Sequence, residues 1–317
     1  MSVCPICLSK RSNLVEKYGK YSVVHCLNCN VVFSDPMKNP GPDWYEENKF
    51  YEVERQYTRL STKSSSHLQF LSKDEKFLKK IQCDKLRLLD IGCGRGLFLE
   101  RVKEKFASVV GVDFESEAIE IGRAKGLEVY CMEISRFLNE YSGEKFDVIT
   151  VRYVLEHVEN PREIIMSVRK LLNPGGYILV TVPNIDCKII NPENNKIFLY
   201  PPHHLTLWSK KAVRNLFEIS GYEVLKIDSG LVIDDINDFV TTSFLGTVYT
   251  VKKALLTKKR TVLLDFLRAF KRWTVRFFAF LALPLLRIFL REGEIILCVA
   301  RLNGQAEPLQ QKGVIAK

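Results

Sequence analysis

Four cysteines near the start of the chain have the spacing of a metal site. Cys4 and Cys7 form one Cys-x-x-Cys pair, and 18 residues later Cys26 and Cys29 form a second pair. Four thiolates on two tight turns are a typical ligand set for one tetrahedral Zn²⁺, although a redox pair uses the same spacing. So short a segment buries little core, and a bound metal would supply its folding free energy. We therefore expect a closed, structural Zn²⁺ site.

A glycine-rich loop at residues 92–96 follows a short apolar strand expected at residues 87–91. Glycines let the backbone approach a ligand closely, and the helix that follows would present free N–H groups to an anion. Asp90, directly before the loop, can accept a hydrogen bond from a ligand ammonium. Asp113 ends the next expected strand, where an acid binds both ribose hydroxyls. A ligand with an ammonium, a carboxylate and a ribose is S-adenosylmethionine (SAM).

Several segments carry a resemblance to class I SAM-dependent methyltransferases. They are Leu-Asp-Ile-Gly-Cys-Gly-Arg-Gly at 89–96, Val-Gly-Val-Asp at 110–113, Phe-Asp-Val-Ile at 146–149, Val-Leu-Glu-His-Val at 154–158 and Asn-Pro-Gly-Gly at 173–176. The resemblance implies that the glycine loop holds the methionyl part, the acid after the second strand holds the ribose, and an aromatic side chain flanks the adenine. The cofactor residues it implies are Asp90, Gly92, Cys93, Gly94, Asp113, Phe114, Glu133 and Arg152. Met132 stands where an Asp is common, so Glu133 is the nearest acid for the adenine amino group.

Two adjacent histidines follow a Pro-Pro pair in the loop before a helix expected to start at Ser209. Loops at the carboxyl ends of parallel strands form the ligand crevice of such a sheet. Methyl transfer to oxygen or carbon needs a base, and neutral imidazole has a suitable pKa. We expect His204, and otherwise His203, to be that base; the structural alternative is that His203 caps the helix. By the resemblance, Glu156-His157 shapes a helix beside the cofactor.

The combination of a ribbon and a methyltransferase domain is similar to bacterial methyltransferases associated with sugar and polysaccharide modification. Deoxysugar C-methyltransferases carry Tyr-His-Glu-His in a loop where this chain has Tyr-Pro-Pro-His-His at residues 200–204. His204 matches the last histidine, whereas His203 replaces the glutamate, so O- and C-methylation both stay open. The resemblance implies a small-molecule or glycan acceptor, either a sugar nucleotide or a lipid-linked glycan.

The length of the chain predicts two domains, and its alternating pattern of strands and helices predicts an α/β fold. The chain has 317 residues, of which 46% are hydrophobic and 26% charged, which excludes a largely disordered chain. Alternating strands and helices predict a Rossmann-like, seven-stranded, mostly parallel sheet with an antiparallel last strand. Within it we expect Ser116 to cap a helix ending at Gly126, and a fifth strand at residues 177–182. The predicted parts are a zinc ribbon (1–40), a linker and helical segment (41–82), the SAM-binding domain (83–230 with 292–303), a helical insert (231–291) and a tail (304–317).

The positive charge is concentrated in the predicted insert. Residues 250–291 hold eleven Lys or Arg and one acid, which equals the net charge of +10 of the whole chain. A basic amphipathic helix with aromatic residues favours an anionic membrane surface or a partner groove, whereas the alternative is a lid packed on the domain. The first residues lack the pattern of a signal peptide, so we expect a cytoplasmic protein. If the insert binds anionic lipid, the protein would be peripheral on the inner face of the membrane. The oligomeric state stays open.

Two other functions compete with this interpretation. An RNA methyltransferase could use the ribbon and insert to bind phosphates. However, residues 1–35 carry four Lys or Arg against two acids, and no Asn-Pro-Pro-Tyr motif for base methylation is present, so nucleic acid is not the expected partner. A non-catalytic scaffold would have no need for Asp90 and Asp113 around an intact glycine loop.

Overall fold

The computed structural model describes residues 2–41, 77–78, 81, 83–187, 199–229 and 295–303. The predicted insert at 231–291, the tail at 304–317 and most of the predicted linker at 41–82 lie outside the described residues. The hypothesis of an anionic membrane surface at residues 250–291 therefore concerns a segment that the structure does not describe. None of the described helices is long and apolar enough to cross a membrane.

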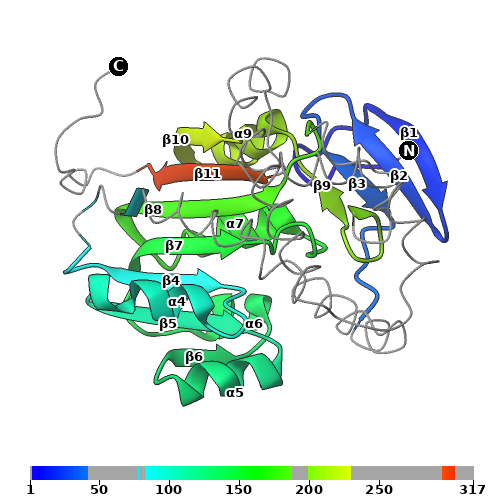
Figure 1. Ribbon diagram of the computed structural model, residues 1–317. Helices are drawn as coiled ribbons and strands as arrows, with labels where there is room; N and C mark the ends of the chain where they lie inside the picture. Colours follow the sequence, from blue (N-terminus) through cyan, green and yellow to red (C-terminus); the bar gives the residue numbers. More distant parts are fainter. Residues whose placement is uncertain are drawn as a thin grey trace, which may run out of the picture.

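Seven strands form one sheet in the order β10-β11-β8-β7-β4-β5-β6 (Figure 1). The sheet is mostly parallel, and the last strand, β11, runs antiparallel to both neighbours, as predicted. The chain moves outward from β4 to β5 and β6 and then returns to β7 on the other side of β4, which is where open α/β sheets bind ligands. The strands are β4 (Arg87–Ile91), β5 (Ser108–Asp113), β6 (Glu128–Cys131), β7 (Phe146–Arg152), β8 (Leu172–Pro183), β10 (Tyr222–Asp228) and β11 (Ile295–Leu302).

Helices cover both faces of this sheet because successive strand side chains point to opposite sides. In β4, Leu89 and Ile91 belong to the core beneath α6, α7 and α9, whereas Leu88 belongs to the core beneath α4 and α5. The helices are α4 (Leu97–Val102) with a 3-10 turn η1 (Lys103–Lys105), α5 (Ser116–Ala124), α6 (Ile134–Glu140), α7 (Pro161–Val168) and α9 (Lys210–Ile219).

Two local predictions differ from the structure. The residue that caps α5 is Glu115 and not Ser116, because the Asp113 carboxylate accepts the Glu115 N–H (3.0 Å) and sets the entry to the helix. The fifth strand, β8, begins at Leu172 and not at residue 177, because Leu172 already pairs with Phe146. The Asn-Pro-Gly-Gly run at 173–176 thus forms an irregularity inside the strand. The predicted end of the α5 segment at Gly126 is confirmed by its φ of 72°.

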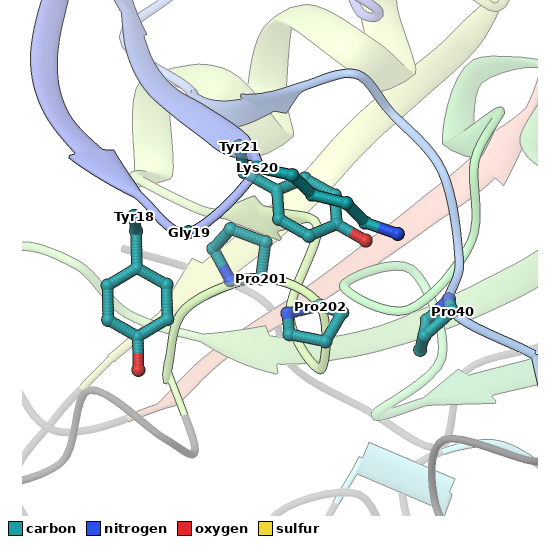
Figure 2. Close-up of a pocket in the computed structure, with 7 residues that line it drawn as sticks. All are labelled: Tyr18, Gly19, Lys20, Tyr21, Pro40, Pro201 and Pro202. Carbon is teal, nitrogen blue, oxygen red and sulfur yellow. The ribbon is translucent and has the colours of Figure 1, made fainter.

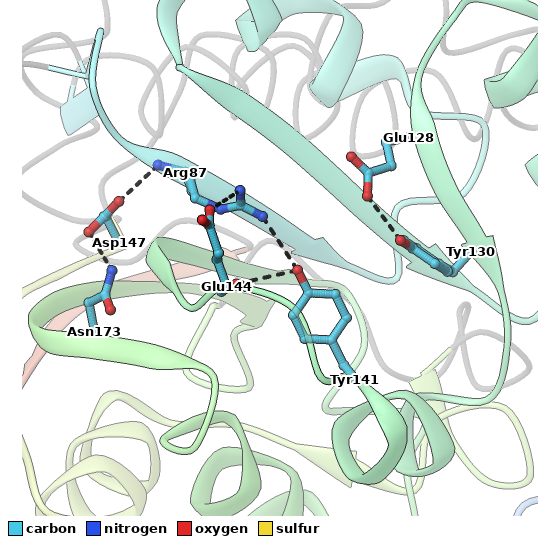
Figure 3. A network of polar contacts seen from close by, with 7 residues as sticks. All are labelled: Arg87, Glu128, Tyr130, Tyr141, Glu144, Asp147 and Asn173. Atoms are coloured by element: carbon cyan, nitrogen blue, oxygen red, sulfur yellow. Dashed lines mark hydrogen bonds and ion pairs between the residues drawn. The ribbon is translucent and has the colours of Figure 1, made fainter.

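A polar network fixes the start of β4 against β7 (Figure 3). The backbone N–H of Arg87 donates to Asp147 Oδ2 (2.9 Å), and the side chain of Asn173 donates to Asp147 Oδ1 (2.8 Å). The Arg87 guanidinium pairs with Glu144 at 2.6 Å, but the Glu144 side chain is 79% exposed, so the ion pair adds little stability. This network lies at the amino ends of the strands and leaves the carboxyl ends to the functional loops.

A second, four-stranded sheet contains the cysteine segment. Its strands are β1 (Ser12–Tyr18), β2 (Tyr21–Cys26), β3 (Val32–Asp35) and β9 (Thr206–Leu207), in the order β1-β2-β3-β9 (Figure 1). The short strand β9 comes from the loop after β8, and it pairs Thr206 with Phe33. Phe33 and Trp208 also belong to one hydrophobic core that continues into the large sheet. The ribbon predicted at residues 1–40 is thus completed by a strand from the part of the chain that builds the large sheet.

Candidate functional site

In the glycine loop after β4, Gly92 packs against a neighbouring side chain, whereas Gly94 faces open space. A Cβ on Gly92 would lie 2.3 Å from Val154 Cγ2, so this position needs glycine for packing against the segment after β7. A Cβ on Gly94 would meet nothing within 4 Å, and its φ of 50° favours glycine. Cys93 between them is buried, and its thiol packs under the loop against Gly111. The backbone at Gly94 is therefore the part of the loop that a ligand can approach.

Asp90 and Arg152 lie at the ends of the neighbouring strands β4 and β7. Asp90 is fully buried; it accepts a hydrogen bond from Thr150 Oγ1 (2.6 Å) and pairs with the Arg152 guanidinium (3.2 Å). That guanidinium also lies 3.9 Å from the centre of the Phe98 ring. Opposite charges side by side match the zwitterionic end of an amino-acid ligand, whose carboxylate and ammonium need one partner each. The sequence predicted both residues as cofactor contacts, and in the structure they contact each other.

Asp113 links the second strand to the glycine loop. Its Oδ2 accepts the N–H of Gly94 (2.9 Å), and its Oδ1 accepts the N–H of Glu115 (3.0 Å). These bonds hold the carboxylate at the carboxyl end of β5, beside the open side of the loop. A carboxylate with two oxygens, each with a second lone pair, still accepts from a ribose diol.

The predicted adenine contacts lie on the surface next to Asp113. Phe114 is 55% exposed, which is unusual for so large an apolar ring and suits a stacking surface for a base. Glu133 is exposed and stands at the N-cap of α6, and the N–H of Met132 donates to the Asp113 carbonyl (2.9 Å). Glycine loop, Asp113 and Phe114 thus line the same edge of the sheet, and these residue types fit SAM.

Three histidines meet at the same edge of the sheet. His157 follows β7, and His203 and His204 precede β9; their ring centres lie 4.6, 4.8 and 4.7 Å apart. The His157 N–H donates back to Val154, the residue that packs on Gly92, so one turn of chain separates this cluster from the glycine loop. The run at 154–157 forms this turn, and the helix that the resemblance implied there is not present. We call His157, His203 and His204 the histidine cluster.

Burial sets the protonation of the histidine cluster and of its neighbour Glu156. Burial lowers the pKa of His203 to about 3, and it lowers the pKa values of His157 and His204 as well. All three imidazoles are therefore neutral near pH 7. Burial also raises the pKa of Glu156 to about 8, and neither of its carboxyl oxygens has a hydrogen-bond partner among the described residues. Glu156 is accordingly a neutral acid at pH 7.

The segment at residues 45–227 matches the profile of a family described as "Methyltransferase domain". The chain belongs to this methyltransferase family. It is 26% identical over 193 residues to a ubiquinone biosynthesis O-methyltransferase of Idiomarina loihiensis, covering 59% of this chain and 74% of that protein. It is 34% identical over 107 residues to an enzyme of the same name from Vibrio cholerae, covering 32% of this chain and 44% of that protein. The chain thus spans less than half the length of the second relative.

Solved methyltransferases share the fold. A SAM-dependent methyltransferase from Archaeoglobus fulgidus superposes with a TM-score of 0.51 at 19% identity, over 77% of this chain and 99% of that one. The plantazolicin methyltransferase BpumL, solved with S-adenosylhomocysteine and a substrate analogue, superposes with a TM-score of 0.51 at 15% identity, over 82% and 93% of the two chains. The family and the site together make this protein a SAM-dependent methyltransferase with a Rossmann-like fold.

The four predicted metal ligands of this methyltransferase come together as expected. Cys4 Sγ lies 3.5 Å from Cys29 Sγ, and Cys7 Sγ lies 3.6 Å from Cys26 Sγ. All four sulfur atoms lie within 4.8 Å of one another, which suits one tetrahedral ion. The hydrogen bond between Cys4 and Cys29 lowers the pKa of Cys4 to about 5 and raises that of Cys29, so the pair shares a proton that a metal would displace. We call these residues the thiol cluster.

A small apolar pocket opens where the ribbon meets the histidine loop (Figure 2). It has a volume of about 220 Å³ and lies between the β1–β2 turn and the Pro201-Pro202 pair, directly before His203. The Tyr18 and Tyr200 rings pack edge to face with centres 5.6 Å apart. The residues that line it are Tyr18, Gly19, Lys20, Tyr21, Pro40, Pro201 and Pro202.

Sequence reasoning missed three contributors to the site. Thr150 holds Asp90, and it could have been noticed as the one polar residue within an otherwise apolar strand segment at 148–151. His157 joins the two predicted histidines, although the family likeness gave it a structural role. Asn39 ties the ribbon to this turn, because its side chain donates to the His157 carbonyl (3.1 Å). No sequence signal marks Asn39, because its partner lies 118 residues away.

Proposed function

We propose that this methyltransferase transfers the methyl group of SAM to a hydroxyl oxygen of a small-molecule or glycan acceptor. The observation that carries the proposal is the histidine cluster, with three neutral imidazoles at the carboxyl edge of the sheet beside the glycine loop. The acceptor hydroxyl loses its proton to an imidazole, its oxygen forms a bond to the methyl carbon, and the bond from that carbon to sulfur breaks. S-adenosylhomocysteine leaves, and His204 is the first candidate for the base.

Oxygen is the favoured acceptor atom for two reasons. A hydroxyl proton passes to a neutral imidazole directly, whereas a C–H proton is far less acidic and needs activation by a neighbouring group. The two relatives from Idiomarina loihiensis and Vibrio cholerae are named O-methyltransferases, which supports the same chemistry. The pocket next to His203 has tyrosine and proline walls and a volume of about 220 Å³, which suits the ring of a small acceptor or a terminal sugar.

For the thiol cluster we propose a structural Zn²⁺. Cys4, Cys7, Cys26 and Cys29 would be its four ligands, which leaves no position for a substrate. The ion would hold the two turns that lead into β1 and follow β2. Its role in the reaction would then be to support the ribbon, which forms one wall of the acceptor pocket.

The test combines label transfer with two variants. Protein and methyl-labelled SAM are mixed with extract of the source cells, which is then separated into sugar-nucleotide, lipid, other small-molecule, RNA and protein fractions. We expect label in a small-molecule or glycan fraction. His204→Ala should keep calorimetric binding of SAM but lose about 10²- to 10⁴-fold in turnover, whereas Asp113→Ala should lose SAM binding itself.

Each outcome has a definite meaning. Label that a mild alkaline treatment leaves in place on a sugar or phenol hydroxyl supports O-methylation. Label confined to RNA or protein overturns the proposal. Wild-type turnover in His204→Ala moves the proton acceptor to another residue, and unchanged SAM binding in Asp113→Ala contradicts the assigned ribose site.

A further inference from the structure

We propose that the histidine cluster is itself a metal site, which binds a divalent cation of the Zn²⁺ type apart from the thiol cluster. His157, His203 and His204 each offer one ring nitrogen, and these three atoms lie within 4.8 Å of one another. A general base needs one imidazole, whereas three converging imidazoles are the ligand set of an open, three-histidine metal centre. The metal site deepens the proposed function, but binding of the ion does not depend on it.

The hydrogen bonding of His157 is the arrangement that metal-binding histidines use. Its Nδ1–H donates to the backbone carbonyl of His203 (2.9 Å). This bond fixes the neutral tautomer and leaves the lone pair on Nε2. Ligand histidines in proteins almost always donate the other ring N–H to a carbonyl or carboxylate in this way, which orients the ring and raises its basicity. The carbonyl comes from a second ligand residue, so the two ligands orient each other.

The cluster contains an unpartnered nitrogen that a cation could bind. Nδ1 of His204 is buried with no hydrogen-bond partner among the described residues. No carboxylate joins the group in the described part of the chain. Three nitrogen ligands favour Zn²⁺, Co²⁺ or Ni²⁺ over Mg²⁺ or Ca²⁺, which prefer oxygen ligands.

The backbone around the ligands is held from two sides. The carbonyl of Glu156 accepts the N–H groups of Leu205 (2.7 Å) and Thr206 (3.3 Å), which brings the loop of His203 and His204 onto the turn of His157. The side chain of Asn39 donates to the His157 carbonyl (3.1 Å) and holds the turn from the ribbon side. Ligand nitrogens around a tetrahedral Zn²⁺ lie about 3.3 Å apart, so small rotations of the rings complete the site.

A three-histidine centre has a free position for the acceptor. The hydroxyl oxygen would bind the cation there and release its proton to solvent, because the cation lowers the pKa of a bound hydroxyl. The resulting alkoxide or phenolate then takes the methyl carbon from sulfur, and the cation stays with its charge unchanged. The histidines would in that case act as ligands, and the cation would carry out the ionisation that the proposed function requires.

The test measures metal binding directly and needs no acceptor. The full chain, freed of loosely bound metal with a mild chelator, is dialysed against excess Zn²⁺ and analysed by mass spectrometry of the elements. We expect two Zn²⁺ per chain, of which the chelator removes one. Titration with Co²⁺ should give intense thiolate-to-metal absorption for the thiol cluster and, at a second equivalent, only the weak visible bands of a nitrogen site.

Matched variants locate the second ion. His157→Ala and His204→Ala should each weaken its binding by more than about 100-fold, whereas His25→Gln, which keeps a side-chain partner for Asn30 in the ribbon, should bind two ions. His204→Cys should retain the second ion and give its Co²⁺ form a new thiolate band, which only a direct ligand can produce. One ion per wild-type chain, or a second ion that all the histidine variants retain, overturns the proposal. Label transfer without the second ion overturns the metal site alone, whereas two ions without label transfer overturn only the proposed function.

Discussion

The thiol cluster and the histidine cluster differ in how the chain assembles them. The thiol cluster uses two Cys-x-x-Cys pairs within the first 29 residues, on the turns next to one hairpin. The histidine cluster joins residues 46 positions apart, from the turn after β7 and the loop before β9. The first could be recognised from spacing alone. The second exists because the large sheet aligns the carboxyl ends of its strands at one edge.

The two clusters are nevertheless joined through β3 and β9. Ser34 N–H donates to the Leu205 carbonyl (2.9 Å), directly after His204, and β3 begins three residues after Cys29. A change at the thiol cluster should therefore reach the histidine loop, whereas the glycine loop on the far side of β7 has its own support in Val154 and Asp113. This asymmetry gives three predictions, from the largest effect to the smallest.

Loss of one thiol ligand should have the largest effect. Cys26→Ser removes a fully buried sulfur of the thiol cluster, and a structural zinc site contributes on the order of 10 kcal/mol to the folding of a small domain. We expect the variant to lose about one Zn²⁺ per chain and to lose turnover, because β9 and the histidine loop lose their partner strand. SAM affinity should change little.

Metal analysis, limited proteolysis of the ribbon and calorimetric titration with SAM check this prediction. Cys131→Ser is the matched control, because Cys131 is the exposed cysteine at the end of β6, away from the thiol cluster. If Cys26→Ser loses SAM affinity as strongly as it loses turnover, the two halves of the site are not independent, and the contrast between them fails.

The spatial arrangement of the glycine loop, Asp90 and Asp113 follows from the sequence more directly than that of the histidine cluster, for a physical reason. Gly92, Gly94, Asp90 and Asp113 lie within a single strand–loop–helix–strand unit, so their spacing along the chain fixes their positions in space. The bounds of β4 could be predicted for the same reason, since hydrophobic periodicity is local. The pairing of β9 with β3 depends on contacts more than 170 residues apart and leaves no periodic signal.

Asp90 shows that the function of a residue cannot be predicted fully from its residue type and its spacing from other residues in the sequence. The residue lies where predicted, but its carboxylate is shared between Thr150 and Arg152. Ligand contact therefore depends on a pair of residues from two strands, and only the fold shows that pair. The same holds for His157, because its role follows from its contacts with His203 and His204 and not from the residues next to it in the sequence.

The pH dependence of the protein's stability should report on Glu156 and the neighbouring histidine cluster. Burial raises the pKa of Glu156 to about 8, above its unfolded value of about 4.3, so its contribution is lost as the pH rises towards 8. Burial lowers the pKa of His203 to about 3, below its unfolded value of about 6.5, so its contribution is lost as the pH falls below 6.5. Between about pH 4.5 and 6.5 the two effects oppose each other, and between pH 6.5 and 8 only Glu156 of these two residues acts.

Glu156→Gln should therefore flatten the upper part of this profile. At Glu156 the native state holds one proton more than the unfolded state from pH 6.5 to 8, which amounts to a loss of at most about 2 kcal/mol of stability in the wild type that Glu156→Gln does not have. Urea unfolding of the zinc-loaded protein at several pH values measures the difference between wild type and Glu156→Gln, with the exposed Glu104 changed to Gln as the control. Equal slopes in wild type and Glu156→Gln would show that the carboxyl is ionised in the folded protein.

The smallest effect should come from Ser209, which joins the ribbon to the end of the histidine loop. Its Oγ accepts the Ala212 N–H (3.1 Å) as the cap of α9 and donates to the Asn30 carbonyl (3.0 Å) beside the thiol cluster. Ser209→Ala should cost about 1 kcal/mol, with the second bond bringing the loss towards about 2 kcal/mol. Ser220→Ala at the other end of the helix is the matched control, because the buried Ser220 Oγ has no hydrogen-bond partner among the described residues. Urea unfolding midpoints compare the stabilities of the two variants. A larger loss of stability in Ser209→Ala, together with faster amide exchange at Asn30, would show that this hydroxyl connects the ribbon to the methyltransferase domain. A loss of stability without faster exchange at Asn30 would limit Ser209 to capping α9.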